Sequence, residues 1–266
     1  MKTKMKKILL ALLFVFATTG MASAITLPIG PVTFHMTNWE NRVTATGQTL
    51  SGIFQIDQLL NSSNATVWNS GMGGEYLYGT FGNSTLTTIN DFGPTGESTG
   101  DQYLFSGGNL KVYLGTSAIN PTNSTTWTAG SLWLDLAMVT GVDFTNPGYT
   151  LVSSITGAGA DPETVPAIKG IGTALLDVVG GSVASQFDTN TYQRYDGTGL
   201  KADVYLNNSF FIRYAPEQGL TGNKDGFPVW SKDPIGANVI PEPTSMLLLG
   251  MGLTGLATRL LKRKVA

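Results

Sequence analysis

The sequence predicts an all-β domain, an antiparallel β-sandwich or jelly roll, between residues 25 and 238. Apolar and polar residues alternate with a period of two in many short segments, which is typical of strands with one buried face. Clusters of Gly, Pro, Asn and Asp separate these segments, and helical periodicity is almost confined to the two ends of the chain. Two packed antiparallel layers would bury so many half-apolar strands.

The expected strands follow one another along the chain. The alternation is clearest in 110–114 and in 132–139, where Leu132, Leu134, Leu136 and Met138 alternate with the other residues. The full set of expected strands is 32–36, 53–59, 75–81, 110–114, 132–139, 173–179 and 203–212. The expected turns are 71–74, 93–96, 146–148, 180–181 and 196–197. Only 59–60 and 163–168 suggest single helical turns, and no repeat of fixed period indicates a propeller or solenoid.

The first 24 residues have the pattern of a secretory signal peptide. An apolar run over 8–17 follows four lysines, Lys2, Lys4, Lys6 and Lys7. Small residues at Ala22 and Ala24 predict cleavage after Ala24, by signal peptidase after export through the general secretion machinery. A retained transmembrane helix is the weaker alternative because the apolar run is short.

The last 28 residues, 239–266, have three parts in order. Pro241, Glu242 and Pro243 come first, and an apolar segment predicted as a transmembrane helix over 244–261 follows. The segment ends in a basic cluster, Arg259, Lys262, Arg263 and Lys264. A helix satisfies its own backbone hydrogen bonds in lipid, and a basic cluster marks the cytoplasmic side, so this pattern predicts a stop-transfer anchor.

This tail resembles the PEP-CTERM sorting signal of exopolysaccharide-producing Gram-negative bacteria. Pro241, Glu242 and Pro243 match the motif that gives the signal its name. The resemblance implies recognition by exosortase, a membrane enzyme that cleaves near this motif, and then placement at the cell surface or in the extracellular matrix. A plain membrane anchor is the alternative. The uncharged run 244–258 is short of the roughly 20 residues that span a bilayer, which favours transient anchoring in the inner membrane.

A second stretch, 170–211, is similar to PEP-CTERM ectodomains of the flocculation-associated group. The matching positions are 176–178, 180–181, 187–190, 202–203 and 209–210. Without the resemblance, the same residues read as a strand, a Gly-Gly turn, a polar loop and another strand. The structural interpretation is the preferred one.

Charge and cysteine content exclude several classes of function. Residues 25–240 contain eight basic and 17 acidic residues, a net charge of −9, which disfavours nucleic acid as a partner because phosphate binding needs a basic surface. The chain has no cysteine, so disulfides, zinc–thiolate sites and cysteine nucleophiles are excluded. The domain must be held together by its apolar core.

No catalytic residue is predicted, and the protein is not expected to be an enzyme. His35 is the only histidine, it lies in an alternating segment, and no Gly-x-Ser-x-Gly motif accompanies it. We therefore expect a surface histidine. A glycosidase would need a pair of carboxylates, which would have to come from acids such as Asp91, Asp101 and Asp135. The sequence does not give the distances between these carboxyl groups.

Calcium is the one cofactor for which the sequence offers ligands. Asp188, Asn190 and Asp196 lie close together in a polar loop, and Asp91, Glu97 and Asp101 form a second acidic region. Calcium is held by carboxylate and amide oxygens of this kind. Neither region has EF-hand spacing, and solvated loop acids are the alternative interpretation.

The sequence thus indicates an exported surface protein with a structural or adhesive role in exopolysaccharide, biofilm or floc formation. Extracellular polysaccharide is the expected partner beyond the sorting machinery. A carbohydrate-binding module is the second interpretation, with Trp127 as the candidate for an exposed sugar-stacking ring. A glycan-active enzyme is the third.

Overall fold

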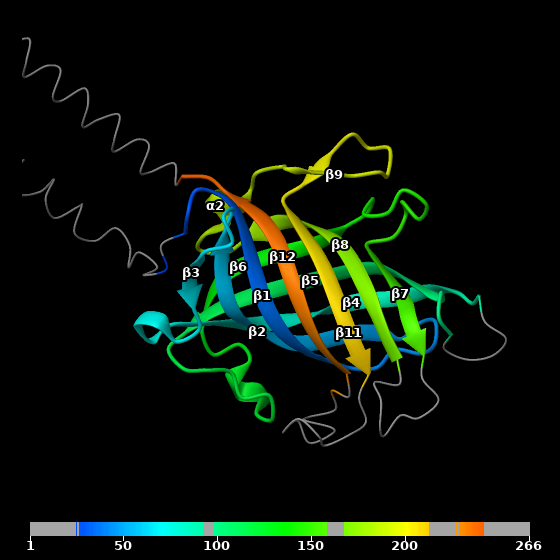
Figure 1. Ribbon diagram of the computed structural model, residues 1–266, viewed down its shortest axis with the longest axis horizontal. Helices are drawn as coiled ribbons and strands as arrows, with labels where there is room; N and C mark the ends of the chain where they lie inside the picture. Colours follow the sequence, from blue (N-terminus) through cyan, green and yellow to red (C-terminus); the bar gives the residue numbers. More distant parts are fainter. Residues whose placement is uncertain are drawn as a thin grey trace, which may run out of the picture.

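The computed structural model describes residues 25, 27–92, 98–158, 168–212, 227 and 229–241. Ten strands within these ranges form one antiparallel sheet, and two more form a separate hairpin. Because its first and last strands also pair, the sheet closes on itself (Figure 1). The result is an eight-stranded antiparallel barrel.

Apart from the first and last strands, which pair to close the barrel, neighbouring strands of the barrel wall are also neighbours along the chain, except that β6 and β7 each pair with β5 and β8 and not with each other. The barrel strands are β1 (Gly30–Glu40), β2 (Thr49–Asn61), β4 (Tyr76–Asn90), β5 (Gln102–Gly115), β6 (Ser131–Val139), β7 (Leu151–Ala158), β8 (Ile168–Gly180), β11 (Val204–Ile212) and β12 (Val229–Val239). The remaining elements are β3 (Thr66–Asn69), η1 (Met72–Gly74), η2 (Ser124–Thr126), α2 (Ala184–Phe187), β9 (Tyr192–Gln193) and β10 (Lys201–Ala202).

β6 and β7 share one position in the barrel wall. β6 pairs with the second half of β5, from Asn109 to Leu114, whereas β7 pairs with its first half, from Gln102 to Phe105. Both also pair with β8. They therefore act as one interrupted strand, and the residues between them leave the wall as a loop.

The all-β, antiparallel prediction is confirmed, whereas the sandwich or jelly-roll arrangement is wrong. The seven predicted strands lie within or largely overlap observed strands, but β7 and β12 were not predicted. β12 is the strand that closes the barrel, through a register with β1 that runs from Gly30↔Val239 to Glu40↔Val229. Alternation shows where a strand has a buried face, but it does not show which strand edges meet.

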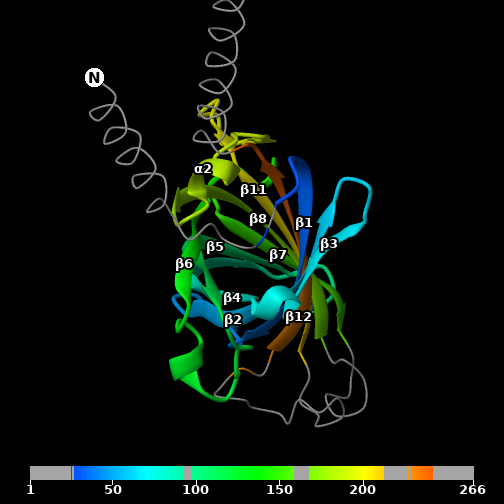
Figure 2. The ribbon, with the colours of Figure 1, turned by 90° about the vertical axis from the view of Figure 1, so that its left-hand side faces the viewer.

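One end of the barrel is filled by three aromatic side chains. Trp133 and Phe187 are fully buried, and their ring centroids lie 5.7 Å apart. Phe34 of β1 packs against both, at 6.3 Å and 5.8 Å. α2, which carries Phe187, lies at the end where β1 begins and β12 ends (Figures 1 and 2). We call this the closed end.

A β-bulge explains why Trp133 points inward. Val112 pairs with Leu134 and Tyr113 with Leu132, so Trp133 is an extra residue in β6. Strict alternation would have placed it on the face opposite Leu134 and Leu136. The bulge turns it into the barrel next to Leu134, and both side chains are buried.

The polar loop after β8 is held against the closed end by a buried carboxylate. Asp203 accepts hydrogen bonds from the backbone N–H groups of Val178, Thr189 and Asn190, at 2.9, 2.7 and 2.6 Å. Gly181 starts the loop with φ of +107°, and a Cβ there would collide with the Trp133 backbone. Much of the stretch that resembles the flocculation-associated group is therefore accounted for by packing and loop geometry.

Outside the barrel, a smaller apolar cluster covers β1, β2 and β4. It contains Trp39, Ile53, Tyr78 and Ile119, with Trp127 packed against it. Trp127 is half-buried, donates its indole N–H to the Asn120 carbonyl at 3.1 Å and lies 5.5 Å from the Phe227 ring. The expectation of an exposed Trp127 is therefore wrong, whereas its sugar-stacking role stays a prediction.

The expected signal peptide, residues 1–24, and the expected transmembrane helix, 244–261, lie outside the described residues. Within the part of the chain that the structure describes, no helix is long and apolar enough to cross a membrane.

Candidate functional site

The opposite end of the barrel contains a cavity of about 80 Å³ that opens to solvent. Its walls come from the last residues of β1 and β11 and the first residues of β2, β5, β7, β8 and β12. We call this the open end. It lies ten residues along β1 from the Gly30↔Val239 pair of the closed end.

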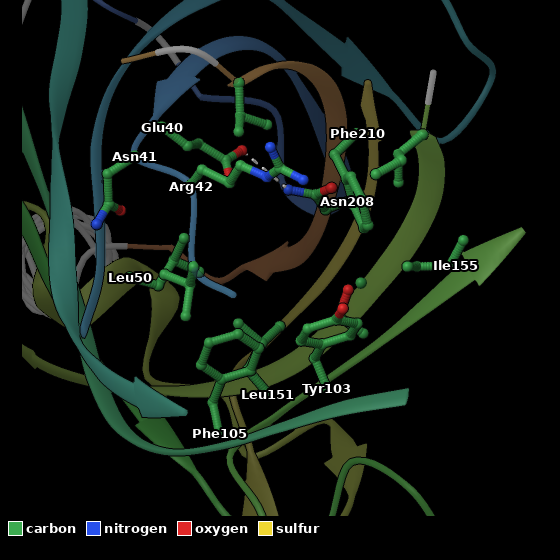
Figure 3. A pocket seen from close by; sticks show the side chains of 15 residues that line it. Glu40, Asn41, Arg42, Leu50, Tyr103, Phe105, Leu151, Ile155, Asn208 and Phe210 are labelled. Carbon is green, nitrogen blue, oxygen red and sulfur yellow. Dashed lines mark hydrogen bonds between the residues drawn. The ribbon is translucent and has the colours of Figure 1, made fainter. Parts of the chain in front are cut away.

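A polar cluster lines one side of the cavity. It is formed by Glu40, Arg42 and Asn208, whose side chains point toward one another (Figure 3). The Glu40 carboxylate accepts hydrogen bonds from the Ser231 hydroxyl at 2.7 Å and from the Asn208 amide at 3.5 Å. Glu40 is only 6% exposed.

Burial sets the protonation of Glu40. It raises the pKa of the carboxyl above its ordinary value, whereas the hydrogen bonds from Ser231, Asn208 and Asn38 act in the opposite direction. A carboxyl in this position can therefore both accept and, when protonated, donate a hydrogen bond.

The other side of the cavity is apolar. Tyr103 and Phe105 of β5 and Leu151 of β7 lie across from the polar cluster (Figure 3). The site thus has an apolar face opposite a polar one, with few polar groups, which is the usual composition of a small-molecule pocket.

Glycine in β8 leaves the space between these two faces. Gly172 lines the cavity, and a Cβ added there would meet Leu151 and Asn208 only at ordinary contact distances of 3.6 and 3.8 Å. Glycine inside a strand often marks a place where a ligand or another chain approaches closely. The absence of a side chain at position 172 therefore contributes to the space.

The cavity offers one carboxylate. Glu40 is the only Asp or Glu among the described residues that line it, whereas glycoside hydrolysis ordinarily uses two. His35 lies on the outer face of β1 and is exposed, as expected from the alternation.

The three residues proposed for calcium lie in the loop at the closed end. Asp196 is engaged elsewhere, in an ion pair with Arg194 and in hydrogen bonds with Thr140 and Thr198. Asp188 accepts a hydrogen bond from the Asn190 amide at 3.2 Å. Among the described residues, no group of three or more His, Cys, Asp or Glu side chains could hold a metal ion. Calcium binding here stays a prediction.

The second acidic region is only partly described, because Glu97 lies outside the described residues. Asp101 is 1% exposed and accepts hydrogen bonds from the backbone N–H groups of Phe92 and Ser98, at 2.8 and 2.7 Å. These bonds give its carboxylate a structural use in shaping the loop.

The fold runs directly into the C-terminal tail. Val239 is the last residue of β12, and the next residue, Ile240, donates its backbone N–H to the Gln186 carbonyl of α2 at 2.8 Å. Pro241 follows and is exposed. Glu242, Pro243 and the basic residues Arg259, Lys262, Arg263 and Lys264 lie outside the described residues.

A family model for the PEP-CTERM protein-sorting motif matches residues 239–264. The chain carries a PEP-CTERM sorting motif. Its first matched residue, Val239, is also the last residue of the barrel. No curated protein and no solved structure matches the chain.

The PEP-CTERM motif implies an exported protein that exosortase processes and that is sorted to the cell surface through the membrane. The recognition of this motif from Pro241, Glu242 and Pro243 is therefore confirmed. Membership of the flocculation-associated group is not shown.

Sequence reasoning missed the polar cluster of the open end. The predicted strand ended at Met36, whereas β1 continues to Glu40. The alternation of Val32, Phe34 and Met36 continues through Asn38 and Glu40, with polar residues in place of apolar ones. That change of character on an unbroken inward face was the available signal.

Proposed function

We propose that the protein is a non-catalytic surface protein with a structural or adhesive role in the extracellular matrix, which displays the open end of its barrel away from the membrane. The pairing of Gly30 with Val239 carries this proposal. It joins the first strand to the last at the closed end, immediately before the sorting motif. Attachment through the motif would leave the open end outermost.

The two ends of the fold support this orientation. No linker separates Val239 from the motif, and the Ile240–Gln186 hydrogen bond continues the fold one residue further. An anchor at 244–261 would follow the last barrel strand after only four residues, which would keep the closed end near the attachment point. The open end then meets the matrix, where polysaccharide is the expected partner.

The proposed sorting is tested by mass spectrometry of the protein released from exosortase-bearing cells. We expect a C-terminus near residues 241–243. Recovery of intact peptides covering residues 262–266 from the released protein would show that the tail is retained and that this part of the proposal is wrong.

The proposed matrix role needs a separate test in the cell. A deletion strain is complemented with the full chain or with a chain that ends at residue 238, and settling of aggregated cells is measured. We expect restoration only by the full chain. Equal restoration by the shortened chain would show that surface attachment is not needed, and an unchanged deletion strain would exclude the role.

We also propose that the protein does not hydrolyse polysaccharide. The single carboxylate in the cavity supports it, because both stereochemical classes of glycoside hydrolase ordinarily use a carboxyl pair. Release of reducing ends from the matrix polysaccharide by the full chain would contradict it, above all if Glu40→Gln abolished that release.

A further inference from the structure

We propose that the cavity at the open end binds a single neutral sugar ring, either a free monosaccharide or the terminal ring of a polysaccharide. The inference goes beyond the proposed function and rests on the cavity alone. Its failure would therefore leave sorting and orientation unaffected. Three features of the cavity favour such a ligand: its hydrogen-bonding groups, its charge and its shape.

The polar side of the cavity matches hydroxyl groups. Arg42 only donates hydrogen bonds, a Glu40 carboxylate only accepts them, and the Asn208 amide does both. Groups that donate and accept at once, as hydroxyls do, are the ones that can satisfy such a mixed set. Hydroxyls can add to the hydrogen bonds that this side already makes among its own residues, whereas a purely apolar ligand offers it none.

Charge favours a neutral ligand. Arg42 and Glu40 bring opposite formal charges to the same side of the cavity (Figure 3). An anionic ligand would be attracted by the Arg42 guanidinium but repelled by the Glu40 carboxylate. A cationic ligand would be attracted by Glu40 but repelled by Arg42. Uronic acids and amino sugars should therefore bind less well than neutral sugars.

The apolar side matches the carbon face of a ring. Phe105, Tyr103 and Leu151 present aromatic and aliphatic surface opposite the polar cluster (Figure 3). A sugar ring has hydroxyls at its edge and C–H groups on its faces, so it can contact both sides at once. A long acyl chain would use only the apolar side.

The size of the cavity limits the ligand to one ring. Its volume of about 80 Å³ has room for only a few ordered waters. A single ring can replace such a group of waters and exchange their hydrogen bonds for its own hydroxyls. Because the cavity opens to solvent, the rest of a polysaccharide can remain outside.

Saturation-transfer NMR on the full-length chain, solubilised in mild detergent, tests the proposal. The probes are glucose, galactose and mannose, the charged sugars glucuronate and glucosamine, the neutral polysaccharide dextran, and decanoate as an acyl probe. We expect transfer to at least one neutral sugar and weaker transfer to the charged ones. Transfer to dextran would show that the cavity accepts the terminal ring of a polysaccharide, whereas transfer to monosaccharides alone would show that it binds a free sugar.

Two variants locate the site. Arg42→Gln removes charged donors and should weaken sugar binding roughly tenfold or more. Gly172→Val should fill the cavity from β8, beside Leu151 and Asn208. Lys111→Gln, which removes an outer-wall ion pair with Asp135, is the matched control and should leave binding unchanged. Thermal unfolding of each variant shows whether it is folded.

The competing location is an exposed aromatic pair, Phe144 and Tyr195, whose rings lie 6.1 Å apart near the closed end. Loss of binding in Phe144→Ala but not in Arg42→Gln or Gly172→Val would overturn the cavity site. Absence of transfer to every neutral sugar and to dextran would overturn the proposal, as would stronger transfer to decanoate than to any sugar.

Discussion

The two ends of the barrel interior are packed differently. The closed end is filled by Phe34, Trp133 and Phe187, and a loop tied to Asp203 lies across it. The open end keeps a cavity and buries a carboxyl, Glu40, beside it. The comparison shows that large buried rings fill the end that leads into the sorting motif, whereas the cavity and its polar groups lie at the far end.

The largest expected effect tests the packing of the closed end. Trp133→Ala removes a fully buried ring that contacts Phe34 and Phe187, and should destabilise the protein by about 3–5 kcal/mol. Thermal or denaturant unfolding measures the loss. The matched control is Phe144→Ala, a ring 78% exposed, which should change stability by no more than about 0.5 kcal/mol. Similar losses in both variants would remove the distinction.

The next effect concerns the loop at the closed end. Asp203→Ala leaves the backbone N–H groups of Val178, Thr189 and Asn190 without their acceptor, at a cost of about 2–4 kcal/mol. Hydrogen exchange should show faster exchange of these amides. Asp143→Ala is the control, because Asp143 lies in an exposed turn and accepts mainly from Thr145 and Asn146. If Asp143→Ala were as destabilising, Asp203 would have no special role.

A smaller effect concerns how the stability contributed by each end of the barrel depends on pH. Hydrogen bonds from Thr140 and Thr198, with help from Arg194, hold the pKa of Asp196 well below its ordinary value. A carboxylate of this kind adds stability above the unfolded-state pKa of about 3.9, and this stability is lost as the pH falls. Asp196→Asn should therefore destabilise more at pH 7 than at pH 3. A loss that is equal at both pH values would contradict the assignment.

Glu40 at the open end should behave in the opposite sense. Because burial raises its pKa, the folded state binds the proton more tightly than the unfolded state. Its contribution is most favourable below about pH 4 and declines as the pH rises through the folded-state pKa. Arg42 is the charged side chain that faces it in Figure 3. Glu40→Gln should gain stability relative to the parent as the pH rises from 4 to 7.

The Glu40→Gln comparison has a clear opposite outcome. The glutamine keeps an acceptor for Ser231 and Asn208, so a stability difference between variant and parent that does not change with pH would show that Glu40 titrates normally. The ends would then not differ in electrostatics, although they would still differ in packing.

The sequence predicts the local parts of this fold better than its closure. Alternation located the first half of β1, the last part of β5 and the whole of β11, because one face of each strand is buried. β12 was not predicted because its sequence lacks a regular alternation of apolar and polar residues. It contains Lys232, Asp233, Pro234 and Gly236. It is nevertheless a full barrel strand, because pairing with β1 and β11 satisfies its backbone.

The candidate site was harder to predict than the sorting signal for a physical reason. Pro241, Glu242 and Pro243 act as a linear motif, so their meaning lies in adjacent residues. Glu40 and Asn208 are 168 residues apart and meet only because the barrel closes. Asp196 pairs with Arg194, two residues away, and with Thr140 just after β6, and the composition of the loop did not indicate these partners.

The proposed outward orientation of the open end can be tested directly, since the chain has no cysteine and single labels are unambiguous. A fluorophore is attached at Ile29→Cys, just before β1, or at Ala45→Cys, in the turn after it, in the full-length precursor reconstituted in bilayers with lipid-linked quenchers. The sites should differ in height by about 25 Å for tilted strands. We expect strong quenching at position 29 and weak quenching at position 45, whereas equal or reversed quenching would contradict the account.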